Sequence, residues 1–62
     1  MRYRVTVSDG WEARAIYFAD EDEAELVYSM AVNSEMFTYA ELSKAGCKYF
    51  TVREWSEEEN AD

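Results

Sequence analysis

The sequence predicts a small α+β domain with the order β-β-α-(α)-β, in which one main helix packs on one face of a three-stranded or four-stranded sheet, antiparallel or mixed. Three observations support this fold class. Residues near the N-terminus alternate between apolar and polar types, a central acidic segment has helical apolar spacing, and residues 48–55 are rich in β-branched and aromatic types. The chain has 62 residues, which allows one domain. We therefore assign residues 1–55 to a single domain and residues 56–62 to an acidic, disordered tail.

The N-terminal segment is predicted to form a β-hairpin with strands at 2–7 and 11–18. Its period-two alternation is typical of half-buried strands, and the intervening Ser-Asp-Gly sequence supplies turn residues. We expect a three-residue loop with a bulge at Gly10, where glycine adopts the positive φ that such a loop requires. This register places Val5 opposite Ala13, so that apolar residues face one another.

A two-residue loop is the alternative, but it would place Val5 opposite the charged Arg14. The preferred register has a consequence for the second strand. Ile16 and Phe18 then point away from the face that carries Val5 and Val7. Either a second irregularity turns this part of the strand, or both faces of the hairpin are apolar. In the second case another layer or another subunit would have to cover the additional face.

Residues 20–33 are predicted to form the main helix. Asp20 is expected to be the N-cap, and the acidic residues 21–23 occupy the first turn, where the helix dipole favours negative charge. Glu23 follows Asp20 by three positions, as in a capping box. The spacing of the apolar residues predicts a buried stripe, widened by Leu26, that consists of Ala24, Val27, Met30, Ala31 and Ser34.

Residues 39–45 are predicted to form a second, short helix. Thr38 and Glu41 have capping-box spacing, and Gly46 stands where a C-cap glycine is common. The alternative is a strand over 37–43 that forms a hairpin with the last strand. Its apolar residues alternate poorly, and we therefore prefer the helix.

The net charge of −8 is concentrated in two acidic blocks, at 20–25 and 57–62. Acids at a helix start and in a tail also serve stability and solubility, but such a surface would fit a protein partner with a basic surface. Trp11 and Trp55 add large side chains of the kind favoured at interfaces. Three tyrosines are expected at exposed edges beside them, namely Tyr28, Tyr39 and Tyr49. The predicted partner-binding residues are Asp20, Glu21, Asp22, Glu23, Glu25, Glu57, Glu58, Glu59, Trp11 and Trp55.

The leading functional hypothesis is a small acidic protein-binding module. In its sharper form the chain is an inhibitor from a phage or another mobile element that mimics DNA, because a carboxylate array can replace phosphates in the groove of a nucleic-acid-binding protein. The alternative is a structural or accessory protein that self-associates as a homodimer through the apolar face of its hairpin. Direct binding of nucleic acid is not expected, because Arg2, Arg4 and Arg14 do not make a basic footprint in so acidic a chain.

Catalysis, metal binding and cofactor binding are not expected. The sequence has no histidine, the commonest general base and metal ligand, and it has one cysteine. Cys47 is expected to be a buried or half-buried apolar residue rather than a reactive thiol. No apolar run approaches the roughly 20 residues of a membrane span, and Met1 is followed by Arg2 and Tyr3 without a signal sequence. We therefore expect a cytoplasmic protein without membrane contact that starts naturally at Met1.

Overall fold

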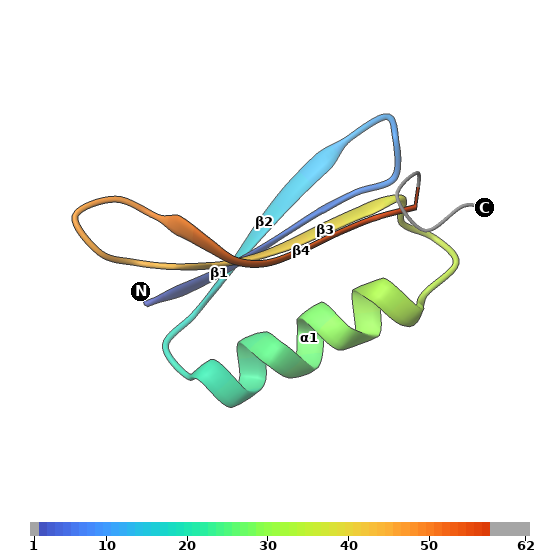
Figure 1. Cartoon of the computed structure of the whole chain (residues 1–62). Coiled ribbons are helices and arrows are strands. Elements are labelled where there is room, and N and C mark those ends of the chain that lie inside the picture. Colours follow the sequence, from blue (N-terminus) through green and yellow to red (C-terminus); the bar gives the residue numbers. More distant parts are fainter. Residues whose placement is uncertain (1, 58–62) are drawn as a thin grey trace.

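The computed structural model describes residues 2–57 of the chain. Its elements are β1 (Tyr3–Ser8), β2 (Ala13–Phe18), α1 (Glu21–Asn33), β3 (Tyr39–Lys44) and β4 (Phe50–Ser56). The four strands form one antiparallel sheet in the order β2-β1-β3-β4. Helix α1 lies along one face of this sheet, and the opposite face carries no helix among the described elements (Figure 1). The predicted α+β class is confirmed, in its four-stranded antiparallel form with one helix.

The segment at 39–44 is a strand, so the predicted helix over 39–45 is wrong and the alternative, a strand over 37–43, is close to the structure. β3 is a central strand that pairs with β1 on one side and with β4 on the other. Ala40 and Leu42 point toward α1 and are buried. Pairing on both edges, together with burial of these two side chains, outweighs the local capping signal that favoured a helix.

The two strands of the N-terminal hairpin pair in a different register from the predicted one. Val5 lies opposite Ile16 and Tyr3 lies opposite Phe18, so the predicted pairing of Val5 with Ala13 is wrong. Residues that lie directly opposite one another in a sheet share a face. The register therefore places Ile16 and Phe18 on the same face as Val5, which is the face that α1 covers in part. No second irregularity in the strand is needed to explain them.

A four-residue loop, Asp9 to Glu12, sets this register. The carboxylate of Asp9 accepts hydrogen bonds from the backbone N–H of Trp11 at 2.8 Å and of Glu12 at 2.9 Å. Gly10 has a φ of +96°, so the prediction of a positive φ at this glycine is confirmed. The loop is longer than expected because an aspartate can bridge the backbone of the following residues, which stabilises a wider turn.

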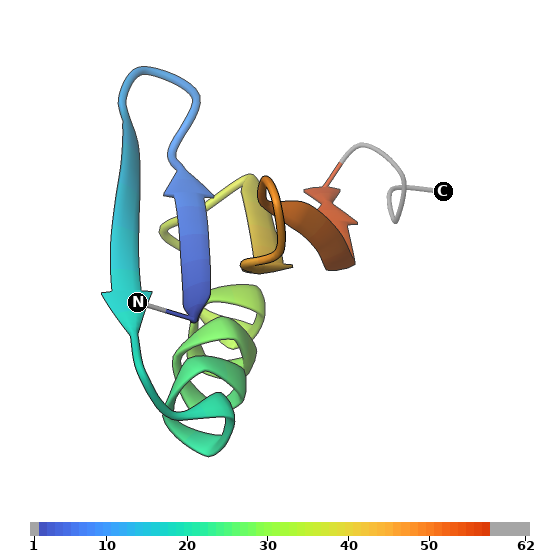
Figure 2. The ribbon, with the colours of Figure 1, turned by 90° about the vertical axis from the view of Figure 1, so that its left-hand side faces the viewer.

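Helix α1 begins at Glu21, and Asp20 is its N-cap, as predicted. The Asp20 carboxylate accepts a hydrogen bond from the backbone N–H of Asp22 at 3.1 Å. The helix packs below β1 and β3 (Figure 2). Its phase differs from the predicted stripe, because Tyr28 is buried whereas Leu26 and Met30 are exposed. The buried core consists of Val5, Val7, Ala24, Tyr28, Ala31, Ala40 and Leu42.

Candidate protein-binding surface

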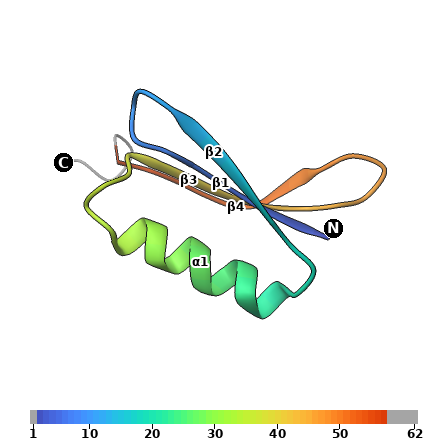
Figure 3. The same cartoon turned by 180° about the vertical axis from the view of Figure 1, so that it is seen from behind.

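The acidic residues predicted to bind a partner lie at two separate places. The block at 20–25 forms the start of α1. Glu57 follows β4, and its strand ends at the opposite end of the molecule from the start of α1, as the front and back views both show (Figure 1, Figure 3). Glu58 and Glu59 lie outside the described residues. The described part of the chain therefore does not join Glu57 and the block at 20–25 into one surface.

Two of the acidic side chains at the start of α1 are engaged within the molecule. Asp20 caps the helix, and a carboxylate oxygen of Glu25 lies 3.0 Å from the guanidinium of Arg53 on β4. The side chains of Glu21, Asp22 and Glu23 remain exposed in the first turn. Only these three residues of the block therefore present carboxylates that no cap bond or ion pair occupies among residues 2–57.

The two tryptophans have different environments. Trp11 lies in the β1–β2 loop and is 93% exposed, so its whole ring is available to a partner. Trp55 lies opposite Ala40 in the sheet, is half-buried and packs against the core. Trp11 therefore remains a candidate interface residue, whereas Trp55 closes the core on the β4 side.

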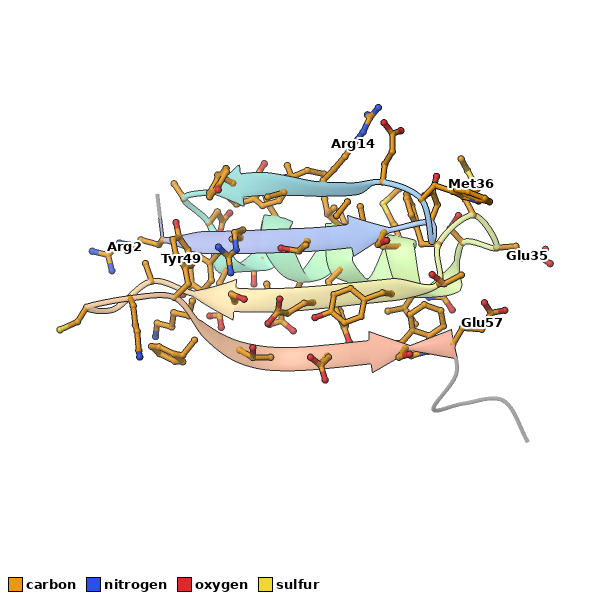
Figure 4. The ribbon with its side chains drawn as sticks, turned by 90° about the horizontal axis from the view of Figure 1, so that it is seen from above. Arg2, Arg14, Glu35, Met36, Tyr49 and Glu57 are labelled. Carbon is orange, nitrogen blue, oxygen red and sulfur yellow. The ribbon has the colours of Figure 1, made fainter. Side chains whose placement is uncertain are left out.

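The arginines of the hairpin are separated. Arg2 and Arg14 lie at opposite ends of the sheet, and the side chain of Arg14 extends beyond β2 (Figure 4). The guanidinium of Arg4 lies over the ring of Tyr49, 4.5 Å from its centroid. Tyr49 also makes an edge contact with Tyr17 at 6.2 Å between centroids. Arg4 therefore helps to hold the β3–β4 loop against the sheet.

One helix is too narrow to cover this sheet. Strands lie about 4.8 Å apart and a helix is about 10 Å wide, so one helix covers roughly two strands. Those strands are β1 and β3, because they supply the buried residues of the sheet. On the β4 side, Trp55 and the Arg53–Glu25 ion pair close the gap beside α1. On the β2 side the gap is open.

This open gap is an apolar groove between β2 and α1, of about 270 Å³, which we call the β2 groove. Ile16 on β2 is 41% exposed and Met30 on α1 is 63% exposed, although both side chains are apolar. Leu26, one helical turn before Met30, is exposed as well. Ser34 is the one polar residue in the lining. The groove is lined by Val7, Ile16, Val27, Met30, Ala31, Ser34 and Phe37.

The β2 groove continues into a smaller depression with a charged rim. This depression has a volume of about 230 Å³ and shares Val7 and Phe37 with the groove. Asp9, Glu12 and Arg14 line its outer part. The backbone N–H groups of Glu12 and Trp11 that bind the Asp9 carboxylate lower the pKa of Asp9. The β2 groove thus ends beside charged side chains that could orient a bound partner.

The backbone of β2 adds unpaired hydrogen-bonding groups beside the groove. The N–H of Asp9 donates to the carbonyl oxygen of Glu12 at 3.2 Å, which marks a hydrogen-bonded pair at the start of the ladder. Such pairs alternate along antiparallel strands. The backbone of Arg14, Ile16 and Phe18 therefore faces β1. The alternate residues are Ala13, Ala15 and Tyr17, and their N–H and C=O groups face away from β1. We call this open side of the strand the β2 edge.

The β2 edge has fewer of the features that protect edge strands than the β4 edge has. No residue of β2 is a proline, its ladder with β1 has no bulge, and Arg14 is its one charged side chain. The opposite edge strand, β4, carries a register shift across from Leu42 and Ser43, together with the charged residues Arg53 and Glu54. The two edges of the sheet therefore differ, and β2 is the one suited to further pairing.

The face of the sheet opposite α1 is polar where β3 and β4 form it. The hydroxyl of Tyr39 donates a hydrogen bond to Glu54 at 3.2 Å, and the hydroxyl of Thr51 donates to Glu41. Burial of the phenol, the negative charge of Glu41 and the bond to Glu54 raise the pKa of Tyr39 to about 12. This face is therefore suited to contact with solvent, in contrast to the β2 groove.

Sequence reasoning missed the β2 groove because it assigned Met30 to the buried stripe. The signal available was the pair Leu26 and Met30, which extends the apolar surface of α1 beyond what one sheet face covers. Cys47 was also mispredicted: it is exposed in the β3–β4 loop rather than buried.

Within residues 2–57, no group of three or more histidine, cysteine, aspartate or glutamate side chains is arranged to hold a metal ion. In the same range, no helix has the length and apolar character needed to cross a membrane. Comparison of the chain with protein-family models, with curated proteins and with solved structures gave no match.

Proposed function

We propose that this chain is a small protein-binding module that takes up a protein partner along the β2 groove and the β2 edge. The observation that carries the proposal is the joint exposure of Ile16 and Met30, which face one another across an apolar groove beside an unpaired strand. Exposed apolar surface next to an open edge is costly in a free protein, and it favours association.

The arrangement suits a partner that binds as an extended strand. Such a segment would hydrogen-bond to the outward backbone groups of Ala15 and Tyr17 and would add a fifth strand to the sheet. Its alternate side chains would enter the β2 groove, since side chains of a strand point to both faces in turn. Backbone pairing would supply affinity, and contacts with Ile16 and Met30 would supply specificity.

Carboxylates contribute to this proposal by local attraction. Glu21, Asp22 and Glu23 are exposed at the start of α1, where they would attract a basic side chain of the partner. An inhibitor that mimics DNA is a weaker alternative, because Asp20 and Glu25 are engaged within the fold and Glu57 lies at the far end. We propose binding rather than catalysis, in the cytoplasm.

Site-specific photocrosslinking in the native host cell tests the proposal. A benzophenone amino acid replaces Met30 in the full chain, and the crosslinked polypeptides are identified by mass spectrometry. Val52 provides the matched control, because it is apolar, lies on β4 and is 48% exposed. We expect a discrete protein adduct from position 30 and none from position 52.

Two further results decide the outcome. The substitution Ile16→Lys, on the facing wall of the groove, should abolish the adduct from position 30, while circular dichroism shows an unchanged fold. The absence of any discrete adduct from position 30, or equal labelling from positions 30 and 52, would contradict a binding role for the groove. A triple change of Glu21, Asp22 and Glu23 to Gln should weaken the adduct only in part and mainly at low salt.

A further inference from the structure

We infer that the partner at the β2 edge is the β2 strand of a second copy of this chain, paired antiparallel about a twofold axis at Ile16. The inference rests on the proposed function, since it names the occupant of the same surface. The two sheets would then form one continuous sheet of eight strands, with both helices on the same face.

The pattern of outward backbone groups restricts how two β2 strands can pair. Symmetric antiparallel pairing that uses the groups of Ala13, Ala15 and Tyr17 can centre on Arg14, on Ala15 or on Ile16. A centre at Arg14 places two like charges directly opposite one another, which is destabilising. A centre at Ala15 places the charged Arg14 opposite the apolar Ile16 of the other copy.

A centre at Ile16 avoids the pair of like charges, and it moves Arg14 from Ile16 to Phe18, the residue of β2 nearest the acidic start of α1. The outward groups of Ala15 would pair with those of Tyr17 in the second copy, and the reverse pairing follows from symmetry. Ile16 would face Ile16 of the second copy in a non-hydrogen-bonded pair, in which Cα atoms lie about 4.5 Å apart. Because Ile16 lies on the face that α1 partly covers, this contact would join the two β2 grooves and remove exposed apolar surface from both copies.

Charge complementarity supports the same register. In it, Arg14 lies opposite Phe18 of the second copy, the residue at which β2 ends before the start of α1. Glu23 precedes Val27 by four residues and Met30 by seven, so it lies on the helix flank that borders the groove. Arg14 would therefore reach the exposed carboxylate of Glu23 in the second copy. The twofold axis would produce this ion pair twice.

Arg14 and Glu23 of one copy cannot make this pair. Arg14 lies at the start of β2 and Glu23 follows its end, and the four residues from Arg14 to Phe18 alone span about 13 Å of strand. Among residues 2–57, Arg14 makes no ion pair, and its side chain extends beyond β2 toward the position of an added strand (Figure 4). If the effect of a substitution at Arg14 on dimerisation depends on the residue at position 23, the two side chains therefore interact between copies.

Sedimentation velocity of the full chain across micromolar concentrations provides the first test. We expect a reversible rise in mass from 7.3 kDa toward twice that value. Ala15→Pro removes an outward N–H without removing a bond to β1, and Ile16→Lys places a charge at the axis; each should leave only monomer. Val52→Lys, the matched change on β4, should dimerise as the wild type does.

A charge exchange provides the second test. Arg14→Glu and Glu23→Arg should each raise the dissociation constant of the dimer about tenfold or more, because each leaves two like-charge contacts. The double variant should recover most of the wild-type affinity, since both ion pairs are restored with opposite polarity. Failure of the double variant to recover affinity, with its circular dichroism spectrum unchanged, would overturn the proposed register.

The photocrosslink at Met30 separates this inference from the proposed function. An adduct of twice the chain mass supports both. An adduct with a different polypeptide, from a chain that sediments as a monomer throughout, would overturn the homodimer while the binding role of the groove stands. A strict monomer without any adduct would overturn both.

Discussion

Glu25 on α1 and Arg53 on β4 form an ion pair at 3.0 Å that ties the helix to one side of the sheet. The opposite side of the helix has no comparable link to β2 among the described residues, and there the groove lies open. The two flanks of α1 therefore differ. Glu25 of the acidic block links one flank to β4, and the other flank is open to a partner.

Removal of this pair should have a small effect on stability. Both side chains are substantially exposed, at 56% for Arg53 and 35% for Glu25, so solvent screens their attraction. We expect Glu25→Gln to lower the free energy of unfolding by about 0.5 kcal/mol in urea titrations. Glu21→Gln, which removes an exposed acid outside any ion pair among residues 2–57, provides the control. A loss of more than about 2 kcal/mol would show that the pair holds α1 in place rather than merely assisting it.

Two leucines provide a matched test of where the core lies. Leu42 is 2% exposed on β3, whereas Leu26 is 62% exposed on α1. Leu42→Ala should lower the free energy of unfolding by about 2–5 kcal/mol, because it removes buried methyl groups and leaves a cavity. Leu26→Ala should change the same quantity by less than about 0.5 kcal/mol. Equal losses of unfolding free energy for the two variants would mean that Leu26 is buried in solution. A dependence of that loss on protein concentration would then show that a second molecule covers Leu26.

The parts of the fold that could be predicted are those set by local signals. Asp20 and the acidic residues after it indicate where α1 begins, because capping and dipole effects act within one turn. Gly10 likewise marks a turn that requires a positive φ. The strand at 39–44 was missed because its stability comes in part from pairing with β1, which is distant in sequence, and from burial of Ala40 and Leu42 under α1.

The candidate site could be predicted only in part, for a related reason. Which flank of α1 is buried depends on where the helix rests on the sheet, and so the exposure of Met30 follows from tertiary packing rather than from helical spacing. The hairpin register depends on the Asp9 carboxylate, which widens the loop by means of two side-chain hydrogen bonds. The acidic block at 20–25 is visible in the sequence, but the ion pair of Glu25 with Arg53 joins a helix and a strand that are not consecutive in the chain.

Tyr39 should titrate at unusually high pH. Its pKa of about 12 lies above the ordinary value of 10.0, mainly because the phenol is partly buried and also because Glu41 and Glu54 oppose a negative phenolate. The folded state therefore retains the phenol proton more strongly than the unfolded state does. The resulting stability is fully present below pH 10 and is lost as the pH rises toward about 12.

Urea titrations between pH 9 and 12 of the wild type and of Tyr39→Phe would test this dependence. Phenylalanine has no phenol proton, so the stability of the variant should fall less steeply over this range than that of the wild type. Glu54→Gln should lower the pKa of Tyr39, measured by ultraviolet absorbance of the tyrosinate. Parallel curves for the wild type and Tyr39→Phe would contradict the assigned pKa.

Asp9 should show the opposite dependence on pH. The N–H groups of Glu12 and Trp11 favour its charged form and lower its pKa below the ordinary value of 3.8. A lowered pKa in the folded state means that the stabilisation by the carboxylate is present above pH 3.8 and is lost as the pH falls through the folded pKa. The loop that fixes the hairpin register should therefore loosen in acid.

Two substitutions at this position separate charge from geometry. Asp9→Asn keeps an oxygen acceptor for both N–H groups, so it should preserve the register of Val5 opposite Ile16 and remove only the dependence on pH. Asp9→Ala removes the acceptor and should lower the urea midpoint at neutral pH as well. Amide chemical shifts of Trp11 and Glu12, followed from pH 6 to pH 2, report the same titration directly. If Asp9→Ala matched the wild type at neutral pH, the four-residue loop would have to be held by its backbone bond between Asp9 and Glu12 alone.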